Sequence, residues 1–371
     1  MKKKLLIFTG TIIEVRNSEI YTKPQFVKYF NELKEFYDIT WITNEKNTSV
    51  FNTSIKNIHV KSFKKRSFKI HLVFYQLYYL YKIFLTDKIL IFLPGGFMLF
   101  PLLFLNIFFK NKIFTYIGVD FSNQIFSNKI FLQKLWKLSL ISLLKNSKGT
   151  ICRGKYLMKM VSSKVGRFNS INTIPLAVFD DNFIHSAISI QNKFRLNTIL
   201  FVGQVKKSKG IFILLDVLKK INNPNSKLII VGTGPDLNSA LSYSKKTGIS
   251  DRVNFAGWID KPSELSSIYS KATFLIQPSI EPEGVPRTID ESIYYNTPVI
   301  ATKVGGVNDE FSDEIIKVSP DNIYEIVDQL NIYLNSFIMY ERLFKLFEER
   351  RNFITKSSPA FQHMNFFKHN K

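Results

Sequence analysis

Short apolar runs alternate with segments of helical spacing along most of the chain. Continuous apolar runs are typical of buried parallel strands, and apolar residues repeated every three or four positions are typical of helices that cover a sheet. Their alternation predicts an α/β fold with parallel sheets and helices on both faces. The predicted strands are residues 5–8, 39–42, 89–93, 113–117, 198–202, 228–231, 274–277 and 299–301, and the clearest predicted helices are residues 26–36, 132–144, 211–221 and 263–270.

This pattern starts afresh once, near residues 172–184, and a chain of 371 residues is long enough for two domains. We therefore predict two doubly wound, Rossmann-like domains, residues 1–175 and 176–350, that face a cleft, the usual ligand position in such folds. The C-terminal helix is expected to return to the N-terminal domain. Residues 351–371 are expected to form a peripheral tail.

Positive charge is concentrated in the first half of the chain. The net charge of +22 divides into +20 over residues 1–175, with 28 Lys or Arg against 8 Asp or Glu, and +2 over residues 176–371. A domain this basic suits an anionic partner: nucleic acid, a membrane surface or a phosphorylated substrate. A solvated, lysine-rich surface is the alternative interpretation.

Two apolar segments bear on a membrane location. Residues 1–13 resemble a signal peptide but lack a small-residue cleavage site, so a buried first strand is favoured. Residues 89–109 carry no charge over 21 positions, which is long enough to span a bilayer. Pro94 and Pro101 interrupt this segment, and a strand, a turn and an apolar helix account for the breaks better than a transmembrane helix does.

A basic cluster adjoins an apolar helical pattern within residues 63–88. A helix that is apolar nearly all round is either buried or in contact with a membrane. Basic residues beside aromatic ones suit an anionic bilayer, so with the charge of the domain we expect peripheral attachment at the inner face of the cell membrane. The basic residues are Lys64, Lys65, Arg66 and Lys69 before the helix and Lys82 and Lys88 at its end.

The segment EPEGVPRTIDES, residues 281–292, places Glu283 and Glu291 on either side of a predicted strand-to-helix junction. Pro286 suits a first helical position, and the free N–H groups of a helix N-terminus attract phosphate. Carboxylates accept hydrogen bonds from hydroxyls instead, so the arrangement suits a diphosphate flanked by polyols, as in a nucleotide sugar. The alternative is that both acids only stabilise the positive end of the helix, by about 0.3–1 kcal/mol each.

A second segment, residues 199–220, has the features of a phosphate site. Its strand ends at Gly203, Lys206, Lys207 and Lys209 follow in a polar loop, and Gly210 opens a helix. Cations beside a helix N-terminus suit a phosphate, although an ordinary loop with solvated lysines has the same pattern. The nearby G-x-G of residues 228–235 is a weak signal that often marks only a turn.

The segment PSIEPEGVPRTIDESIYYNTPVIATKVGGVNDE resembles the signature of glycosyltransferase family 4, whose members are retaining enzymes with the two-domain GT-B fold. The family pattern E-G-[FV]-[GP]-x-x-x-x-E, then P-V-I-A-[ST], a G-G pair and an acid is present in order from Glu283 to Glu310. FVGQVKKSKGIFILLDVL, LIIVGTGP and RVNFAGWI also resemble family segments. The resemblance covers residues 170–350. The first half resembles the family only in its alternation of strands and helices.

The resemblance implies roles for residues of the second half. Glu283 would contact donor-sugar hydroxyls, Glu291 the ribose, and Lys209 a phosphate. Gln204, after Gly203, stands where the family usually has an arginine, a loss of charge for which Lys206, Lys207 or Arg287 could compensate. Backbone amides near Gly284, Val285, Arg287 and Thr288 would face the diphosphate, and the backbone around Trp258 and Ile259 would meet the nucleobase.

The acceptor side is expected in the first half. Gly10, placed after the first predicted strand, could admit the donor diphosphate closely. Ile117 or Gly118 stands where many family members have a histidine, and Asp120 is the nearest polar candidate, with a helix-cap or turn acid as the alternative. By the resemblance, the departing phosphate takes the acceptor proton, so catalysis rests on positioning and on stabilising the leaving charge, without a metal.

The single cysteine, Cys152, cannot form an intrachain disulfide, which favours a reducing compartment. The resemblance implies a retaining, metal-independent glycosyltransferase, and with the charge of the first half we expect it to act in bacterial polysaccharide or glycolipid assembly. Its donor would be a UDP- or GDP-linked sugar, and its acceptor a lipid-linked or oligosaccharide molecule. The alternatives are a nucleotide-sugar epimerase of the same fold, a binding-only scaffold and a basic nucleic-acid-binding protein, the last without any recognisable nucleic-acid motif.

Overall fold

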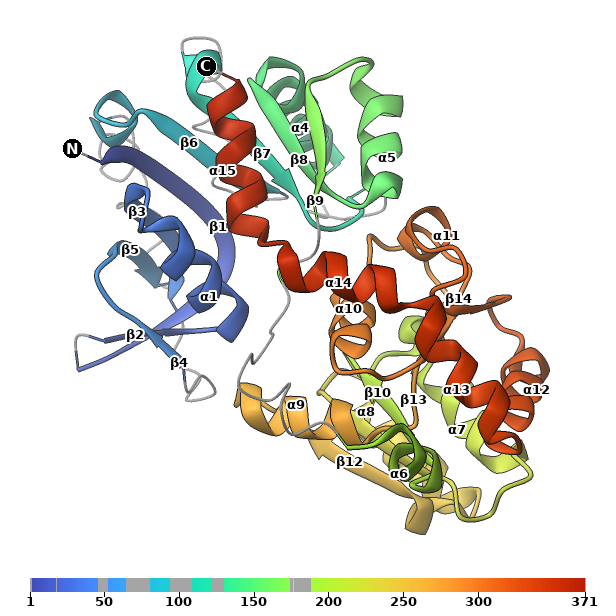
Figure 1. Cartoon of the computed structure of the whole chain (residues 1–371). Coiled ribbons are helices and arrows are strands. Elements are labelled where there is room, and N and C mark those ends of the chain that lie inside the picture. Colours follow the sequence, from blue (N-terminus) through green and yellow to red (C-terminus); the bar gives the residue numbers. More distant parts are fainter. Residues whose placement is uncertain are drawn as a thin grey trace. The chain divides into compact units, whose positions relative to one another are not determined.

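The computed structural model describes residues 2–17, 19–45, 53–64, 81–93, 109–121, 130–173, 176 and 188–370. The chain divides into two compact units (Figure 1). The N-terminal unit comprises Met1–Leu176 with Ser358–Lys371, and the C-terminal unit comprises Ala177–Ser357. Each unit contains a largely or wholly parallel sheet with helices on both faces, so the predicted α/β fold of two Rossmann-like domains is confirmed.

The N-terminal sheet is ordered β4-β2-β1-β6-β7-β8-β9, with β3 paired to β1 and β5 paired to β3. The pairs that join β1, β3, β5, β6, β7, β8 and β9 are parallel, whereas β2 pairs antiparallel with β1 and β4. The strands are β1 (Lys3–Arg16), β2 (Glu19–Thr22), β3 (Tyr37–Glu45), β4 (Thr53–Ile55), β5 (His59–Lys64), β6 (Lys88–Leu93), β7 (Ile113–Ile117), β8 (Gly149–Arg153) and β9 (Ser170–Thr173).

The first strand is much longer than the apolar run predicts, and this corrects the place of Gly10. The strand β1 continues past Phe8 through a register shift against β3 and resumes pairing at Ile12. Gly10 therefore lies inside β1, exposed, instead of in a loop after the strand. An irregularity of this kind bends a strand without ending it, which lets the far end of β1 pair with β2.

Two layers of helices cover the N-terminal sheet. On one face, Leu5, Ile7, Trp41 and Phe114 pack with α1 and α15. On the other, Leu6, Phe8 and neighbouring strand residues pack with α4, α5 and the helical residues 81–84. Successive residues of β1 thus point to opposite faces, as in any strand buried on both sides. The helices of this unit are α1 (Pro24–Leu33), the 3-10 turn η2 (Lys110–Lys112), α4 (Ile130–Asn146), α5 (Lys155–Val165) and α15 (Pro359–His369).

The last helix, α15, is part of the N-terminal core, so residues 359–369 are not the peripheral tail that we expected. Ala360, His363, Met364, Phe366 and Phe367 are all buried in it. The signal was present in the sequence, because these apolar residues recur at helical spacing behind Pro359 at a helix start. This helix is the C-terminal element that returns to the N-terminal unit, as predicted.

His363 holds α15 in place through a buried hydrogen-bond network. The Tyr29 hydroxyl lies 2.8 Å from Nδ1, and Nε2 lies 3.2 Å from Thr173 Oγ1. Because Thr173 donates its own proton to Gln362, Nε2 carries the histidine proton and Nδ1 accepts from Tyr29. Burial lowers the pKa of His363 to about 3, so the ring stays neutral in the folded protein.

We expect the N-terminal unit to lose roughly 2 kcal/mol of unfolding free energy between pH 7 and pH 5 through His363 alone. The folded pKa lies below the unfolded one, so the stabilisation is present above pH 6.5 and is lost as the pH falls toward 3. Urea unfolding followed by fluorescence measures it, because Trp41 and Trp136 are buried in this unit. His363→Gln, which keeps polar partners but cannot titrate, should flatten the slope; the same slope in both proteins would contradict the assignment.

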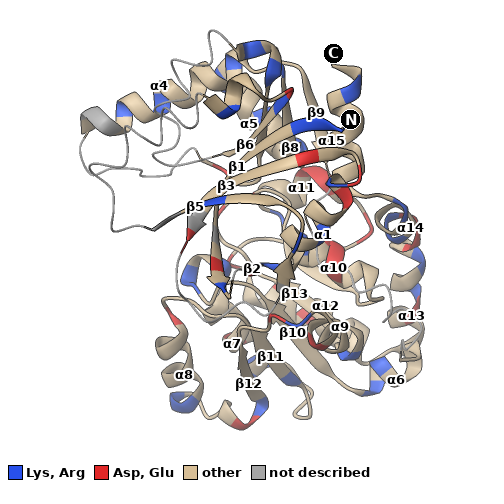
Figure 2. Cartoon of the chain, turned by 90° about the vertical axis from the view of Figure 1, so that its left-hand side faces the viewer, with Lys and Arg blue, Asp and Glu red and all other residues tan. Residues whose placement is uncertain are grey.

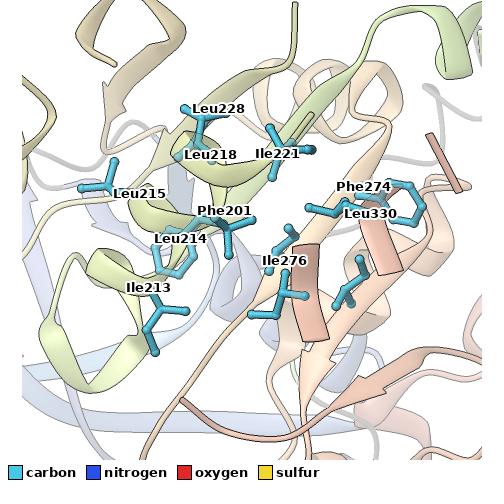
Figure 3. Close-up of a cluster of buried hydrophobic side chains, with 14 of the residues drawn as sticks. Phe201, Ile213, Leu214, Leu215, Leu218, Ile221, Leu228, Phe274, Ile276 and Leu330 are labelled. Atoms are coloured by element: carbon cyan, nitrogen blue, oxygen red, sulfur yellow. The ribbon is translucent and has the colours of Figure 1, made fainter. Parts of the chain in front are cut away.

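The C-terminal sheet has six strands in the order β12-β11-β10-β13-β14-β15, and every pair is parallel. In Figure 3, the labelled leucines of α7 lie around Phe201 of β10, and Phe274 of β13 lies beside Leu330 of α12. The strands are β10 (Thr198–Val202), β11 (Lys227–Val231), β12 (Val253–Gly257), β13 (Phe274–Gln277), β14 (Val299–Thr302) and β15 (Ile316–Val318). The helices are α6 (Ile190–Arg195), η4 (Lys207–Lys209), α7 (Ile211–Lys220), α8 (Leu237–Lys246), η5 (Ser250–Arg252), α9 (Pro262–Lys271), α10 (Arg287–Tyr294), α11 (Gly306–Glu310), α12 (Ile323–Leu334), α13 (Phe337–Leu346) and α14 (Glu348–Lys356).

Within the described ranges, no helix is both long and apolar enough to cross a membrane. Residues 94–108, the larger part of the long apolar segment, and residues 65–80 of the expected basic helix lie outside the described residues. Lys88 differs from the expectation, because it begins β6 instead of closing a helix. Its Nζ donates to the Phe367 carbonyl at 2.6 Å, and burial lowers its pKa to about 8.

Candidate functional site

Four loops of the C-terminal unit begin at the carboxyl ends of β10, β11, β13 and β14, which are adjacent parallel strands. The carboxyl edge of a parallel sheet is where ligands bind in open α/β folds. The loop after β10 contains Gln204 and Lys209, and the loop after β13 contains Glu283. The topology therefore brings the two main sequence candidates to one edge of one sheet.

Lys209 and Glu283 form a direct ion pair. Lys209 Nζ lies 2.6 Å from Glu283 Oε2, and the two side chains are 29% and 23% exposed. The other carboxylate oxygen accepts a hydrogen bond from Ser279 Oγ at 2.8 Å. Both groups therefore remain accessible to a ligand while each holds the other in position, which is the preorganisation that a polar binding site needs.

Glycines allow these loops to approach one another closely. A Cβ on Gly210, whose φ is +74°, would lie 2.0 Å from the Pro278 carbonyl oxygen, and a Cβ on Gly232, whose φ is +130°, would lie 1.9 Å from that of Gly203. The Ile280 amide also donates to the Ser208 carbonyl at 2.9 Å. A larger residue at Gly210 would push the loop of Lys209 away from the loop of Glu283, and a larger residue at Gly232 would push apart the loops after β10 and β11.

The loop of Glu283 is fixed to the start of α11. The Gly306 amide donates to the Glu283 carbonyl at 2.7 Å. Gly305 has a φ of +49°, and a Cβ there would lie 2.3 Å from the same carbonyl oxygen. The G-G pair in the sequence therefore positions the backbone of Glu283, which explains why the two motifs occur together.

The helix α10 starts directly after this loop. Its first helical residue is Arg287, and Pro286 occupies the preceding N-cap position, one residue earlier than predicted. A helix leaves its first N–H groups without intrahelical acceptors, and in α10 these belong to Arg287 and Thr288. Thr288 is itself held by Gln277, whose Nε2 donates to Thr288 Oγ1 at 2.8 Å. Gly284 and Val285 are buried just before the helix.

Glu291 lies in the second turn of α10 and is only 1% exposed. The Tyr269 hydroxyl donates to its Oε2 at 2.8 Å, and Arg287 Nε lies 3.8 Å from its Oε1. Glu291 is therefore anchored more deeply than Glu283. Tyr269, which sequence analysis missed, orients it from α9.

A buried lysine anchors the far end of α10. Lys193 Nζ donates to the carbonyl oxygens of Tyr295 and Asn296 at 3.1 and 2.7 Å and to Thr297 Oγ1 at 2.7 Å. Carbonyl groups at a helix C-terminus have no intrahelical partner, and a cation also complements the helix dipole there. Burial lowers the pKa of Lys193 well below its ordinary value.

Arg350, a second residue missed from the sequence, holds the middle of α10. Its Nε and Nη2 donate to the two oxygens of buried Asp290 at 2.9 and 3.2 Å, and its Nη1 lies 3.7 Å from Glu310. Burial raises the pKa of Asp290 to about 6, against the lowering effect of Arg350. The acid that ends the family signature, Glu310, thus faces α14.

The remaining candidates of the C-terminal unit lie in the loop after β10 and directly after β12. Gln204 is exposed, and Lys206 and Lys207 beside it are exposed as well. The Lys207 backbone amide donates a hydrogen bond to Asp236 Oδ2 at 2.7 Å. Trp258 and Ile259 directly follow β12, and Trp258 is exposed.

The N-terminal candidates lie in the other unit. Asp120, in the loop after β7, accepts a hydrogen bond from the Tyr156 hydroxyl at 2.6 Å. Gly118 lies beside the Tyr116 ring, and a Cβ there would approach Tyr116 Cε1 to 2.9 Å. A histidine at this position would therefore displace Tyr116. Asp120 and Gly10 remain predictions as ligand contacts.

The arrangement in the C-terminal unit combines three kinds of binding group: a lysine cation, free helix N-terminal amides and carboxylates. The first two bind a phosphate group, and the carboxylates accept hydrogen bonds from hydroxyls. Among the described residues, no group of three or more His, Cys, Asp or Glu side chains could hold a metal ion.

Residues 187–350 match the family described as "Glycosyl transferases group 1". The chain is 30% identical over 151 residues to lipopolysaccharide 1,6-galactosyltransferase of Escherichia coli, and 29% identical over 212 residues to alpha-monoglucosyldiacylglycerol synthase of Streptococcus pneumoniae. These matches cover 39% and 53% of this chain, and 41% and 46% of the two relatives, so the chain spans less than half of either.

Solved structures show the same fold over the whole chain. Sucrose-phosphate synthase from Thermosynechococcus elongatus has a TM-score of 0.75 at 16% identity, with 99% of each chain covered. A protein from Anabaena in complex with UDP-glucose has a TM-score of 0.68 at 14% identity, with 99% and 98% covered. The family match and the two relatives confirm the resemblance to glycosyltransferases, and the solved structures confirm the fold. The comparisons do not favour the epimerase alternative.

Proposed function

We propose that the protein is a glycosyltransferase that moves a sugar from a nucleoside-diphosphate sugar to an acceptor with retention of configuration and without a metal. The observation that carries this proposal is the Lys209–Glu283 pair at the carboxyl edge of the C-terminal sheet, beside the free N-terminus of α10. Both groups lie in the segment that matches the glycosyltransferase family. The structure of an Anabaena neighbour with UDP-glucose supports the same class of donor.

In this proposal, the donor diphosphate lies at the N-terminus of α10, against the amides of Arg287 and Thr288, with Lys209 beside it. Glu283 accepts hydrogen bonds from the sugar hydroxyls, and Glu291 from the ribose. As the bond between the anomeric carbon and the phosphate oxygen breaks, negative charge grows on the diphosphate, where Lys209 and the helix N-terminus stabilise it. The acceptor hydroxyl forms the new bond on the same face, and its proton passes to the departing phosphate.

In this proposal, the Lys209–Glu283 ion pair has a role before the donor binds. Without a donor, the two groups neutralise each other at 2.6 Å. A diphosphate would take over part of the interaction with Lys209, and Glu283 would then become free to accept from hydroxyls. The pair therefore keeps both groups oriented for the donor and prevents an unpaired charge in a partly buried site.

Gln204 leaves this site with one cation fewer than the family pattern. We propose that Arg287 supplies the missing charge, because its guanidinium lies at the first turn of α10, 3.8 Å from Glu291. Lys206 and Lys207 are the other cations of the same loop, and both are exposed.

The proposed acceptor is a lipid-linked or oligosaccharide molecule at the inner face of the cell membrane. Two observations support it: the charge of +20 on residues 1–175, and two relatives named for a lipopolysaccharide and a diacylglycerol glycolipid. The proposal assigns acceptor binding to the N-terminal unit, with Asp120 as the candidate contact.

The experiment that tests the function is product analysis with a panel of UDP-, GDP-, ADP- and TDP-sugars. We expect one of them to raise the melting temperature and to release its nucleoside diphosphate faster when a membrane extract is added as acceptor. Nuclear magnetic resonance of the product should show the anomeric configuration of the donor. An inverted anomer would contradict the retaining mechanism, and an isomerised sugar formed without acceptor would indicate an epimerase.

A further inference from the structure

One layer of the N-terminal unit carries a surface that the proposed donor site does not use. The helices α4 and α5 and the helical residues 81–84 cover one face of the N-terminal sheet. Their inner sides contribute Ile83, Trp136, Leu140, Leu157 and Val161 to a single buried core. The opposite sides of these helices are therefore turned away from that core.

The outer side of α4 also exposes apolar residues. Ile130 is 75% exposed, Leu138 is 65% exposed and Leu135 is 36% exposed. A surface helix usually places polar residues opposite its buried stripe, whereas α4 exposes aliphatic residues together with lysines there. In α4, Trp136 and Leu140 fill the core while Ile130 and Leu138 remain uncovered.

Exposed apolar side chains also occur within and directly after the helical residues 81–84 of the same layer. Phe84 is 65% exposed, and Tyr81 and Leu85 beside it are also exposed. The Phe84 ring contacts Phe109 edge-on at 4.9 Å between centroids, and Ile83 belongs to the same core as α4. The exposed aromatic and aliphatic residues thus come from elements of one layer.

Exposed lysines lie on the helices of the same layer. The exposed lysines are Lys134, Lys137 and Lys145 on α4 and Lys155, Lys159 and Lys164 on α5, and neither helix contains an acidic residue. Figure 2 shows Lys and Arg on both helices. Over residues 88–175 the sequence contains 13 Lys or Arg and a single acid, Asp120. The positive charge of the N-terminal half is therefore present on the same layer as its exposed apolar residues.

We infer that Ile130, Lys134, Leu135, Lys137 and Leu138, called the α4 surface below, dock this protein on an anionic lipid bilayer. In that position Ile130, Leu135 and Leu138 enter the boundary between head groups and acyl chains, and Lys134 and Lys137 contact the anionic head groups. This deepens the proposed function, on which it rests for the membrane-linked acceptor, by naming the surface that meets the membrane.

Other occupants fit this surface less well. Two copies of it would bring lysines against lysines without an acid to pair them, so a symmetric dimer through α4 is disfavoured. A single-stranded nucleic acid would require aromatic residues among the cations for base stacking, whereas the exposed apolar residues of the α4 surface, Ile130, Leu135 and Leu138, are aliphatic. An anionic bilayer can bury the aliphatic side chains among its acyl chains while its head groups pair with the lysines.

The test is cosedimentation of the full chain with vesicles of equal parts phosphatidylglycerol and phosphatidylcholine, and with vesicles of phosphatidylcholine alone. We expect binding to the anionic vesicles, weakened by salt, and little binding to the neutral ones. Leu138→Glu, and separately Lys134→Gln with Lys137→Gln, should each lower the apparent affinity at least about tenfold. Because all three positions are exposed, these variants should fold like the parent protein.

Ile338→Glu on α13 is the matched control, because Ile338 is equally exposed, at 66%, in the C-terminal unit. It should leave vesicle binding unchanged. The inference is overturned if the parent protein ignores anionic vesicles, if Leu138→Glu and Ile338→Glu bind them equally, or if single-stranded RNA displaces the protein from them. Calorimetry of donor binding separates a failure of this inference from a failure of the proposed function. The proposed donor site does not involve α4, so Leu138→Glu should bind the donor like the parent protein even where it no longer binds vesicles.

Discussion

Glu283→Ala should lower the sugar-transfer rate at least about tenfold. Hydrogen bonds from substrate hydroxyls to a carboxylate are charge-assisted and contribute roughly 1.5–3 kcal/mol, which corresponds to a factor of about ten to a hundred in rate. The carboxylate also holds Lys209 at 2.6 Å, so its loss removes a positioning contact of the phosphate-binding cation. Release of nucleoside diphosphate, with a saturating donor sugar and acceptor, measures the effect.

Glu281→Ala is the matched control for this prediction. Glu281 lies two residues away in the same loop and is exposed, and the family signature does not fit a register that uses it. Its replacement should change transfer little. Binding of the nucleoside diphosphate without its sugar should fall much less than transfer in Glu283→Ala, because the lost contacts are to sugar hydroxyls. If Glu283→Ala transfers at the parent rate, Glu283 is not part of the site.

Phe367→Ala should destabilise the N-terminal unit by about 3–5 kcal/mol, the usual cost of deleting a buried phenyl ring. Phe367 is completely buried on α15, where its ring lies 4.7 Å from Phe114 and 6.4 Å from Tyr37 between centroids. Its carbonyl also accepts from Lys88. Urea unfolding followed by fluorescence measures the loss, because Trp41 and Trp136 are buried in this unit.

Phe361 provides the comparison, because it lies on the same helix and is half exposed. Phe361→Ala should cost less than about 1 kcal/mol, as surface substitutions generally do. If both variants unfold at the urea concentration of the parent protein, α15 is the peripheral tail that we first expected. If Phe367→Ala and Phe361→Ala lose equally large amounts of unfolding free energy, then the side of α15 that contains Phe361 is buried as well.

The central parallel strands were predictable from the sequence to within one residue at each end, and these are β6, β7, β10, β11, β13 and β14. The parallel strands β5, β9, β12 and β15 were not among the predicted strands. Strands buried on both faces must be continuously apolar, so β6, β7, β10 and β13 are visible without any knowledge of their partners. The extension of β1 beyond Phe8 was not predictable, because it follows a bulge over Thr9–Thr11 and depends on pairing with β2. Local pattern shows that a strand exists, whereas its end depends on a distant partner.

The residues of the candidate site were also predictable only where the sequence signal is local. Glu283, Lys209 and Glu291 were visible because their spacing from glycines and from a helix start is local. Tyr269, Gln277 and Arg350 were not visible, because each reaches α10 from another element through one long-range contact. Lys209 and Glu283 were both named from the sequence, but their mutual ion pair follows only from the packing of Gly210 against Pro278.

The most direct test of the central claim, that the C-terminal unit grips an activated sugar by its diphosphate, is calorimetric titration with UDP, GDP, ADP and TDP. We predict that one of these nucleoside diphosphates binds the parent protein and that Lys209→Met binds it at least about tenfold more weakly, through the loss of a charge-assisted contact. Absence of heat with all four compounds, or equal binding by the parent and Lys209→Met, would contradict the account.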